Sequence, residues 1–156
     1  MTIPALSQTW RRSKTLVAAL ATLGVQPADV RYVGISHVHP DHVGNLDMFP
    51  DATVVMQKPE WDYAMALPQK PFSPEHKTQL LAGDKDLFGD GTVRVISTPG
   101  HTPWHQSLAV KLTKTGTVVL TGDAVHFQVA SISKRPKTER RVLLARITSI
   151  GLRANV

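Results

Sequence analysis

The sequence predicts an α/β domain in which a mixed sheet is flanked by helices. Short apolar, β-branched runs alternate with helix-like segments, and turns containing Pro or Gly separate them. The 156 residues suit a single domain, and a composition of 42% apolar and 19% charged residues is typical of a globular protein with a sizeable core. The sequence contains no internal repeat or low-complexity segment.

The first predicted element is an amphipathic helix over residues 15–25, because its leucines recur at helical spacing and Gly24 can end it. A buried strand over residues 30–36 follows a short loop. Two later segments begin with proline, which is favoured in the first turn of a helix, and we predict helices over 59–67 and 74–81. The remaining predicted strands cover residues 53–56, 92–97, 107–112 and 117–121.

The charge distribution divides the chain into two parts. The formal net charge is +6, yet residues 1–130 hold 11 basic and 11 acidic side chains, whereas residues 131–156 hold seven basic and one acidic. We therefore predict a neutral domain over 1–130 and a basic C-terminal tail over 131–156, with neither nucleic acid nor a membrane as partner. An amphipathic helix built on Val142, Leu143, Ile147 and Ile150 is an open alternative for the tail.

The chain has no cysteine, which excludes disulfides, thiolate metal ligands and a cysteine nucleophile. A cysteine count of zero does not distinguish a cytosolic enzyme from a secreted one. We expect a cytoplasmic protein. A periplasmic location stays open, because three basic residues precede the apolar run over 15–25, as in a secretory signal peptide.

The strongest functional signal is a histidine cluster at the end of the first predicted strand, His37-Val38-His39-Pro40-Asp41-His42. Alternate residues of an extended segment face the same way, so His37 and His39 can point at one ion. The turn at Pro40 then presents Asp41 and His42 to a neighbouring position. Imidazole and carboxylate suit Zn²⁺, and also Fe²⁺, Mn²⁺ or Co²⁺. The pattern predicts two adjacent metal sites.

Two later residues also stand where predicted strands end. His101 lies at the tip of a tight turn formed by Pro99 and Gly100. Asp123 follows an apolar strand and Gly122, and a single carboxylate in such a place is suited to bridging two cations. These residues extend the predicted metal centre beyond the histidine cluster.

Taken in order, the motifs His37-x-His39-x-Asp41-His42, Thr-Pro-Gly-His101-Thr-Pro and Thr-Gly-Asp123 resemble the metallo-β-lactamase-fold hydrolase superfamily over roughly residues 14–128. The resemblance implies an αββα sandwich. It also implies a first metal held by His37, His39 and His101, a second held by Asp41 and His42, and Asp123 as the bridge between them.

The sequence departs from the superfamily pattern in one respect. A late histidine normally completes the second site, but the only histidine after Asp123 is His126, which follows too closely. We therefore expect an incomplete αββα sandwich from a truncated reading frame or a degraded paralogue. Unpaired sheet edges would then favour poor solubility or association into a homo-oligomer.

Residues 54–61 and 101–108 look most similar to the quorum-quenching N-acyl homoserine lactonase group. This similarity implies a zinc-dependent hydrolase that opens a small-molecule lactone or ester by attack of a metal-bound hydroxide, with Asp41 relaying a proton. Those lactonases carry a tyrosine three residues after the bridging aspartate, where this chain has His126, so we predict His126 as a catalytic proton donor; a packing role is the alternative. Trp104 stands where the group usually has glycine, and it either strains the His101 loop or lines the substrate mouth.

Two other functions stay open at this point. One is a different hydrolase of the same superfamily, either a glyoxalase II-like thioesterase or a β-lactamase-like enzyme. The other is a non-catalytic remnant that binds one metal ion through His37, His39 and His101, or none.

Overall fold

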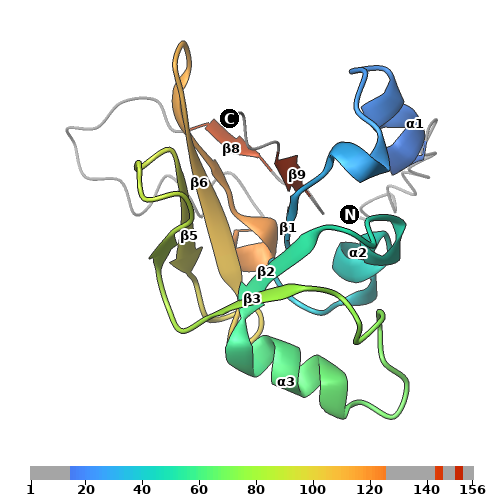
Figure 1. Cartoon of the computed structure of the whole chain (residues 1–156). Coiled ribbons are helices and arrows are strands. Elements are labelled where there is room, and N and C mark those ends of the chain that lie inside the picture. The colour runs from blue at the N-terminus through green and yellow to red at the C-terminus, as the bar shows by residue number, and fades with distance from the viewer. Residues whose placement is uncertain (1–14, 126–142, 146–149, 153–156) are drawn as a thin grey trace, which may run out of the picture.

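The computed structural model describes residues 15–125, 143–145 and 150–152, which form two sheets (Figure 1). The first sheet contains β1 (Tyr32–Gly34), β2 (Thr53–Gln57), β3 (Thr78–Leu81) and β9 (Ile150–Leu152) in the order β3-β2-β1-β9. The second contains β4 (Lys85–Asp86), β5 (Val93–Ser97), β6 (Gln106–Leu112), β7 (Gly116–Leu120) and β8 (Leu143–Ala145) in the order β4-β5-β6-β7-β8.

Both sheets contain parallel and antiparallel neighbours. Strands β1, β2 and β3 run parallel to one another, and β9 pairs with β1 in the antiparallel direction. In the second sheet the pairs from β4 to β7 are antiparallel, and β8 is parallel to β7. The predicted α/β class with a mixed sheet is therefore confirmed.

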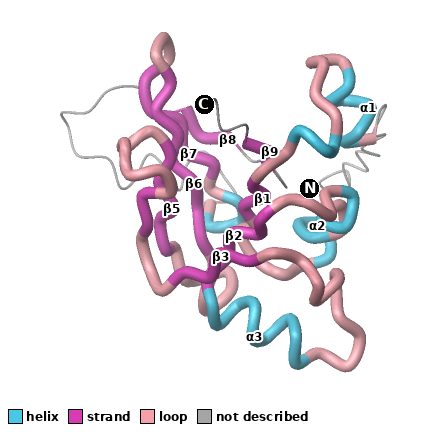
Figure 2. The backbone as a smooth tube through the Cα atoms, viewed as in Figure 1, coloured by secondary structure: helices cyan, strands magenta, loops and turns pink. Residues whose placement is uncertain are grey.

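Helices α1 (Leu16–Ala21), α2 (Pro40–Val43) and α3 (Lys58–Ala66) pack on one face of the first sheet. Figure 2 shows the cyan helices to the right of and below the magenta strands. Side chains alternate across a strand, so Val54 and Met56 of β2 join this helical core, together with Val33 of β1 and Ala64 of α3. Helix α1 begins where the Thr15 hydroxyl accepts a hydrogen bond from the amide of Ala18 at 3.2 Å.

The other face of the first sheet packs against the second sheet. Val55 lies between the two core-facing residues of β2 and points the opposite way, where it meets Leu81 of β3 and Val95 of β5 in a second core cluster. The described residues thus form helix, sheet and sheet layers, which are three of the four layers of an αββα sandwich.

Two sequence predictions on secondary structure need correction. The predicted helix over 74–81 is wrong, because Thr78–Leu81 forms β3 and pairs with β2. Leu81 is buried between the sheets. The segment 74–81 has only two leucines, which are adjacent, so a helix there would lack the apolar face that packing requires. The alternative of a helix in the tail is also wrong for Leu143–Ala145 and Ile150–Leu152, which are strands β8 and β9. The rest of 131–156 lies outside the described residues.

A buried amide pair joins the two sheets at the edge where the metal-ligand candidates lie. The Gln57 side chain donates to Oε1 of Gln106 at 3.0 Å, and Gln106 in turn donates to the carbonyl of Ile35 at 2.8 Å. The backbone N–H of Gln106 also donates to the carbonyl of Ser36 at 2.9 Å. These bonds hold the end of β1 against the start of β6, so the segments that follow β1 and precede β6 meet at one place.

Candidate metal centre

Five of the predicted ligand side chains converge in two overlapping groups. We call His37, His39 and His101 the outer group, and His37, His42 and Asp123 the inner group. Within each group the ligand atoms all lie within 4.8 Å of one another. The inner group is buried throughout, whereas His39 and His101 of the outer group are exposed.

These side chains come from three separate places in the fold. His37 and His39 follow β1, and His42 lies in α2, which begins at Pro40. His101 lies on the loop between β5 and β6, and Asp123 lies in a short 3-10 turn, Gly122–Ala124, after β7. The site therefore joins both sheets and exists only when they are packed together.

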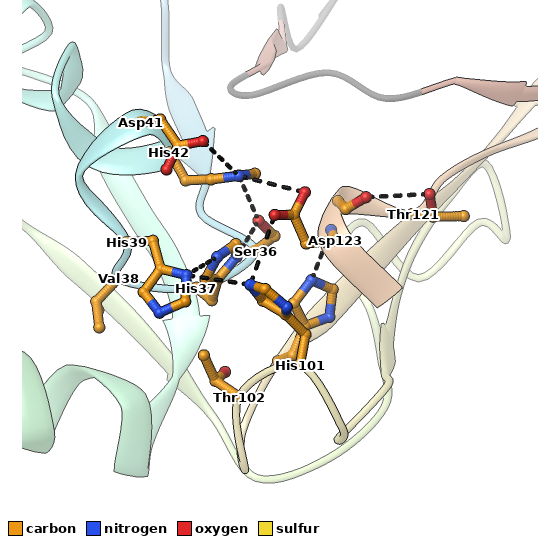
Figure 3. A network of polar contacts seen from close by, with 12 residues as sticks. Ser36, His37, Val38, His39, Asp41, His42, His101, Thr102, Thr121 and Asp123 are labelled. Carbon is orange, nitrogen blue, oxygen red and sulfur yellow. Dashed lines mark hydrogen bonds and ion pairs between the residues drawn. The ribbon is translucent and has the colours of Figure 1, made fainter. Parts of the chain in front are cut away.

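Asp123, a member of the inner group, lies between His42 and His101 (Figure 3). Its Oδ1 is 3.4 Å from Nε2 of His42, and its Oδ2 is 3.5 Å from Nε2 of His101. One carboxylate oxygen therefore faces a histidine of the inner group and the other faces a histidine of the outer group; the bridging role of Asp123 stays a prediction.

Ser36 orients two of the buried imidazoles. Its hydroxyl lies 3.1 Å from Nδ1 of His37 and 3.2 Å from Nδ1 of His42, so the Nε2 atom of each ring faces the site. Burial, followed by the neighbouring imidazoles, lowers the pKa of His37 to about 3. His37 is therefore neutral at pH 7, which is the form that binds a metal ion.

A directed chain of hydrogen bonds fixes the turn that carries Asp123. The Asp123 amide donates to Nε2 of His105 at 3.2 Å, so Nδ1 of His105 carries the proton and donates to the Thr98 hydroxyl at 2.8 Å. Thr98 then donates to Ser107 at 2.9 Å, and Ser107 donates to the carbonyl of Thr121 at 3.2 Å. Burial is the main cause that lowers the pKa of His105 to about 4, which agrees with this neutral tautomer.

The position next to this series of hydrogen bonds requires a glycine, Gly122. Its φ is +54°, and a Cβ added to it would lie 2.8 Å from both Nε2 of His105 and Cβ of Ser36. Only glycine combines that backbone conformation with so close an approach.

The other predicted site residues lie around these groups. Asp41 is exposed and belongs to neither group, although its Oδ2 lies 3.5 Å from Nε2 of His42. Trp104 is 39% exposed, and its ring lies 6.5 Å from that of Tyr63 between centroids. His126 lies outside the described residues, and its predicted role stays a prediction.

A cavity of about 910 Å³ opens beside the outer group. His39 and His101 form part of its wall. Much of the remaining wall is apolar or aromatic, with contributions from Val38, Tyr63, Leu67, Pro103 and Trp104. A substrate in this cavity can therefore present a polar group to the outer histidines and an apolar group to the opposite wall.

Sequence reasoning did not single out two residues that support the centre, Ser36 and Glu60. Glu60 is buried in α3 and accepts hydrogen bonds from the segments that carry the outer ligands. Its spacing of four residues from the buried Ala64 indicates that it lies on the buried face of the helix, and this signal could have identified it. Ser36 has no comparable signal, because nothing in the sequence separates a serine that supports a histidine cluster from a serine in an exposed turn.

The comparisons with known proteins define the class to which this fold and site belong. A model of the metallo-beta-lactamase superfamily matches residues 6–142, and the chain belongs to this superfamily. The predicted family and fold class are thereby confirmed.

The similar proteins that carry a specific function are lactonases. The chain is 40% identical over 129 residues to the N-acyl homoserine lactonase AttM of Azorhizobium caulinodans, a match covering 74% of this chain and 49% of that protein. It is 33% identical over 112 residues to the N-acyl homoserine lactonase of a Bacillus species, covering 70% and 44%. The chain thus spans about half the length of the curated relatives it matches.

Solved structures agree on the fold. An N-acyl homoserine lactone hydrolase with the product N-hexanoyl-L-homoserine bound at its catalytic metal centre matches with a TM-score of 0.61 and 31% identity, covering 69% of this chain and 43% of that one. AidC, a dizinc quorum-quenching lactonase, matches with a TM-score of 0.58 at 21% identity, which supports the fold alone. Within the described part of the chain, no helix has the length and apolar character needed to cross a membrane.

Proposed function

We propose that this chain supplies the metal-binding part of a zinc-dependent hydrolase that opens the ring of an N-acyl homoserine lactone. The observation that carries the proposal is the pair of ligand groups that share His37, with the Asp123 carboxylate between His42 and His101, next to a largely apolar cavity. The lactonase relatives support the substrate class.

The donor set fits divalent transition metals. Four imidazoles and one carboxylate converge without any thiolate, and the buried His37 is neutral at pH 7. Zinc would be held by this donor set, and Fe²⁺, Mn²⁺ or Co²⁺ would be accepted as well. Bound in such a centre, a metal pair polarises a carbonyl and lowers the pKa of a water molecule toward neutrality.

The protein's own side chains then bind and orient the substrate. In the proposal, the lactone carbonyl approaches the outer group, because only this group faces the cavity. The acyl group lies against the apolar wall that includes Tyr63 and Trp104. Asp41 is exposed beside His42 and is placed to exchange a proton with solvent after ring opening.

The test measures metal content and substrate preference together. Purified protein loaded with zinc is assayed for ring opening of N-acyl homoserine lactones, with a thioester and a β-lactam as competing substrate classes. We expect lactone opening that a chelator abolishes and zinc restores. Preference for the thioester or the β-lactam would reject the lactone assignment, and protein that binds no metal would support the remnant hypothesis.

Two variants make this test specific to the centre. Asp123→Ala removes the carboxylate that lies between His42 and His101, and we expect it to abolish turnover. His76→Gln is the matched control, because His76 is a buried histidine that pairs with Asp47 at 2.8 Å outside both groups. Turnover in His76→Gln is expected to remain close to that of the parent protein.

A further inference from the structure

Glu60 is a buried carboxylate whose two oxygens bind two different loops. The residue is 1% exposed and lies in the first turn of α3. Its Oε1 accepts the backbone N–H of Val38 at 3.0 Å, and its Oε2 accepts the hydroxyl of Thr102 at 3.1 Å. Neither partner carries a charge.

The two partners of Glu60 are chain neighbours of the outer ligands. Val38 lies between His37 and His39, and Thr102 directly follows His101. One carboxylate therefore connects the segment after β1 with the loop between β5 and β6. Both segments border the cavity, and Glu60 itself forms part of the cavity wall.

A purely space-filling role does not explain this arrangement. Burying a carboxylate away from water is costly unless hydrogen bonds satisfy it, and an apolar side chain would fill the same space without that cost. The two bonds instead connect two loops that no strand pairing joins at His39 and His101, where Nδ1 of His39 also lies 3.1 Å from Nε2 of His101. Removing a group that fixes the position of metal ligands without contacting the metal commonly lowers metal affinity by about 10- to 100-fold.

We infer that Glu60 is a positioning residue that sets the distance between His39 and His101 and thereby tunes metal binding by the outer group. The inference rests on the proposed function for its biological meaning, but it concerns metal affinity and can be tested without turnover. It assigns no proton transfer and no substrate contact to Glu60.

Four variants separate positioning from folding. Glu60→Leu removes both hydrogen bonds, whereas Glu60→Gln retains an acceptor for Val38 and offers an N–H to Thr102. Thr102→Val removes only the second bond and keeps the side-chain shape, and Thr102→Ser retains the hydroxyl. Asp47→Leu is the matched control, because Asp47 is a carboxylate that accepts the backbone N–H of Ser73 at 3.0 Å and pairs with His76 at 2.8 Å, and neither partner lies on a ligand loop.

The measurements are zinc affinity, by competition with a chromophoric chelator, and the melting temperature of the metal-free protein. We expect Glu60→Leu and Thr102→Val to weaken the zinc site of the outer group by about 10-fold or more. Glu60→Gln and Thr102→Ser are expected to stay within about threefold of the parent. Asp47→Leu should lower the melting temperature without a matching loss of affinity.

Two results would overturn the inference: parent-like zinc affinity in both Glu60→Leu and Thr102→Val, or a loss in Thr102→Ser equal to that in Thr102→Val. If Glu60→Leu fails to fold, the Thr102 pair decides the question alone. Lactone turnover distinguishes the two proposals. A parent protein that binds zinc with the expected pattern of variants but opens no lactone rejects the proposed function and keeps the positioning role.

Discussion

The outer and inner groups share His37 but differ in their surroundings. His39 and His101 of the outer group are exposed and border the cavity, whereas His42 and Asp123 of the inner group are buried. The outer group can therefore contact a substrate, and the inner group cannot do so without a change in structure.

The supports of the two groups differ in the same way. The inner group is surrounded by side chains that fix ring orientation and backbone together, namely Ser36, His105 and the glycine turn at Gly122. Glu60 connects the two loops that carry the outer ligands, and the imidazoles of those ligands also contact each other directly, with Nδ1 of His39 3.1 Å from Nε2 of His101. This difference indicates that inner-group changes act on the fold as well as on metal binding, whereas outer-group changes act mainly on the site.

The largest effect is expected from Gly122→Ala. The new Cβ would lie 2.8 Å from both His105 and Ser36 at a φ of +54°. The positive φ alone costs about 1–2 kcal/mol, and the close approach must displace side chains that orient the inner group. We expect the variant to lose zinc from the inner group and to unfold at lower urea concentration, as measured by metal analysis and urea denaturation.

Gly24→Ala is the matched control for that variant. Gly24 has a similar φ of +68°, but an added Cβ there would meet nothing within 4 Å. It should therefore show the backbone cost without the loss of metal. Equal zinc content in Gly122→Ala and Gly24→Ala would show that the close packing at Gly122 is unimportant.

The next prediction compares one ligand from each group. We expect His42→Ala and His39→Ala each to reduce bound zinc by about one ion per chain. Their stabilities should differ, because His42 is buried and His39 is exposed. In urea denaturation of the metal-free proteins, His42→Ala is expected to lose about 1–3 kcal/mol and His39→Ala at most about 0.5 kcal/mol. Similar losses in both would remove the distinction between the groups.

The pH dependence of the metal-free protein gives a graded effect on stability that is spread over several pH units. Burial lowers the pKa of His37 from 6.5 to about 3 and that of His105 from 6.5 to about 4. The unfolded chain therefore binds more protons than the folded one below pH 6.5, so stability is complete above that pH and declines as the pH falls toward 4. The free energy of unfolding should be lower at pH 4.5 than at pH 7.5.

Asp47 is expected to affect stability mainly in a lower pH range. Burial raises the pKa of Asp47, but the hydrogen bond from the Ser73 amide and the contact with His76 outweigh burial and hold it below 3.8. The stability that this aspartate contributes is lost mainly below that pH. An unfolding free energy that stays constant between pH 7.5 and 4.5 would therefore contradict the assignment of neutral buried histidines.

The sequence indicated the candidate ligands more readily than it indicated the residues that support them. Histidines and carboxylates at strand ends are visible because their chemistry and spacing are local to each motif. By contrast, Glu60 acquires its role from Val38 and Thr102, which are distant in the chain, so only the packed sheets reveal it. The same limit explains the error over residues 74–81, where pairing with β2 overrides the helix-start signal of Pro74.

The tail illustrates a further limit of charge as a guide. Residues 131–156 differ in charge from the preceding domain, yet Leu143–Ala145 pairs with β7 and Ile150–Leu152 pairs with β1. Strand pairing uses backbone groups and is therefore compatible with a change in side-chain charge. The proposed division at residue 130 consequently stays a prediction about composition.

The smallest expected effect comes from changing Trp104, which borders the cavity next to the outer group. This side chain borders the cavity and lies near Tyr63, away from the buried inner group, so its removal should change substrate binding without changing metal content. In Trp104→Ala we expect the KM for long-chain lactones to rise by about three- to tenfold, equivalent to about 1 kcal/mol of apolar contact, with little change for short-chain lactones.

Phe88→Ala is the matched control for Trp104→Ala, because Phe88 is 38% exposed against 39% for Trp104, and it contacts Tyr32 rather than the cavity. A chain-length effect confined to Trp104→Ala would indicate that the cavity wall binds the acyl group. Reduced zinc content in Trp104→Ala would instead mean that the indole supports the His101 loop, since Trp104 lies three residues beyond His101 on that loop. The ratio of the two effects therefore measures how far substrate binding at the outer group is separable from metal binding.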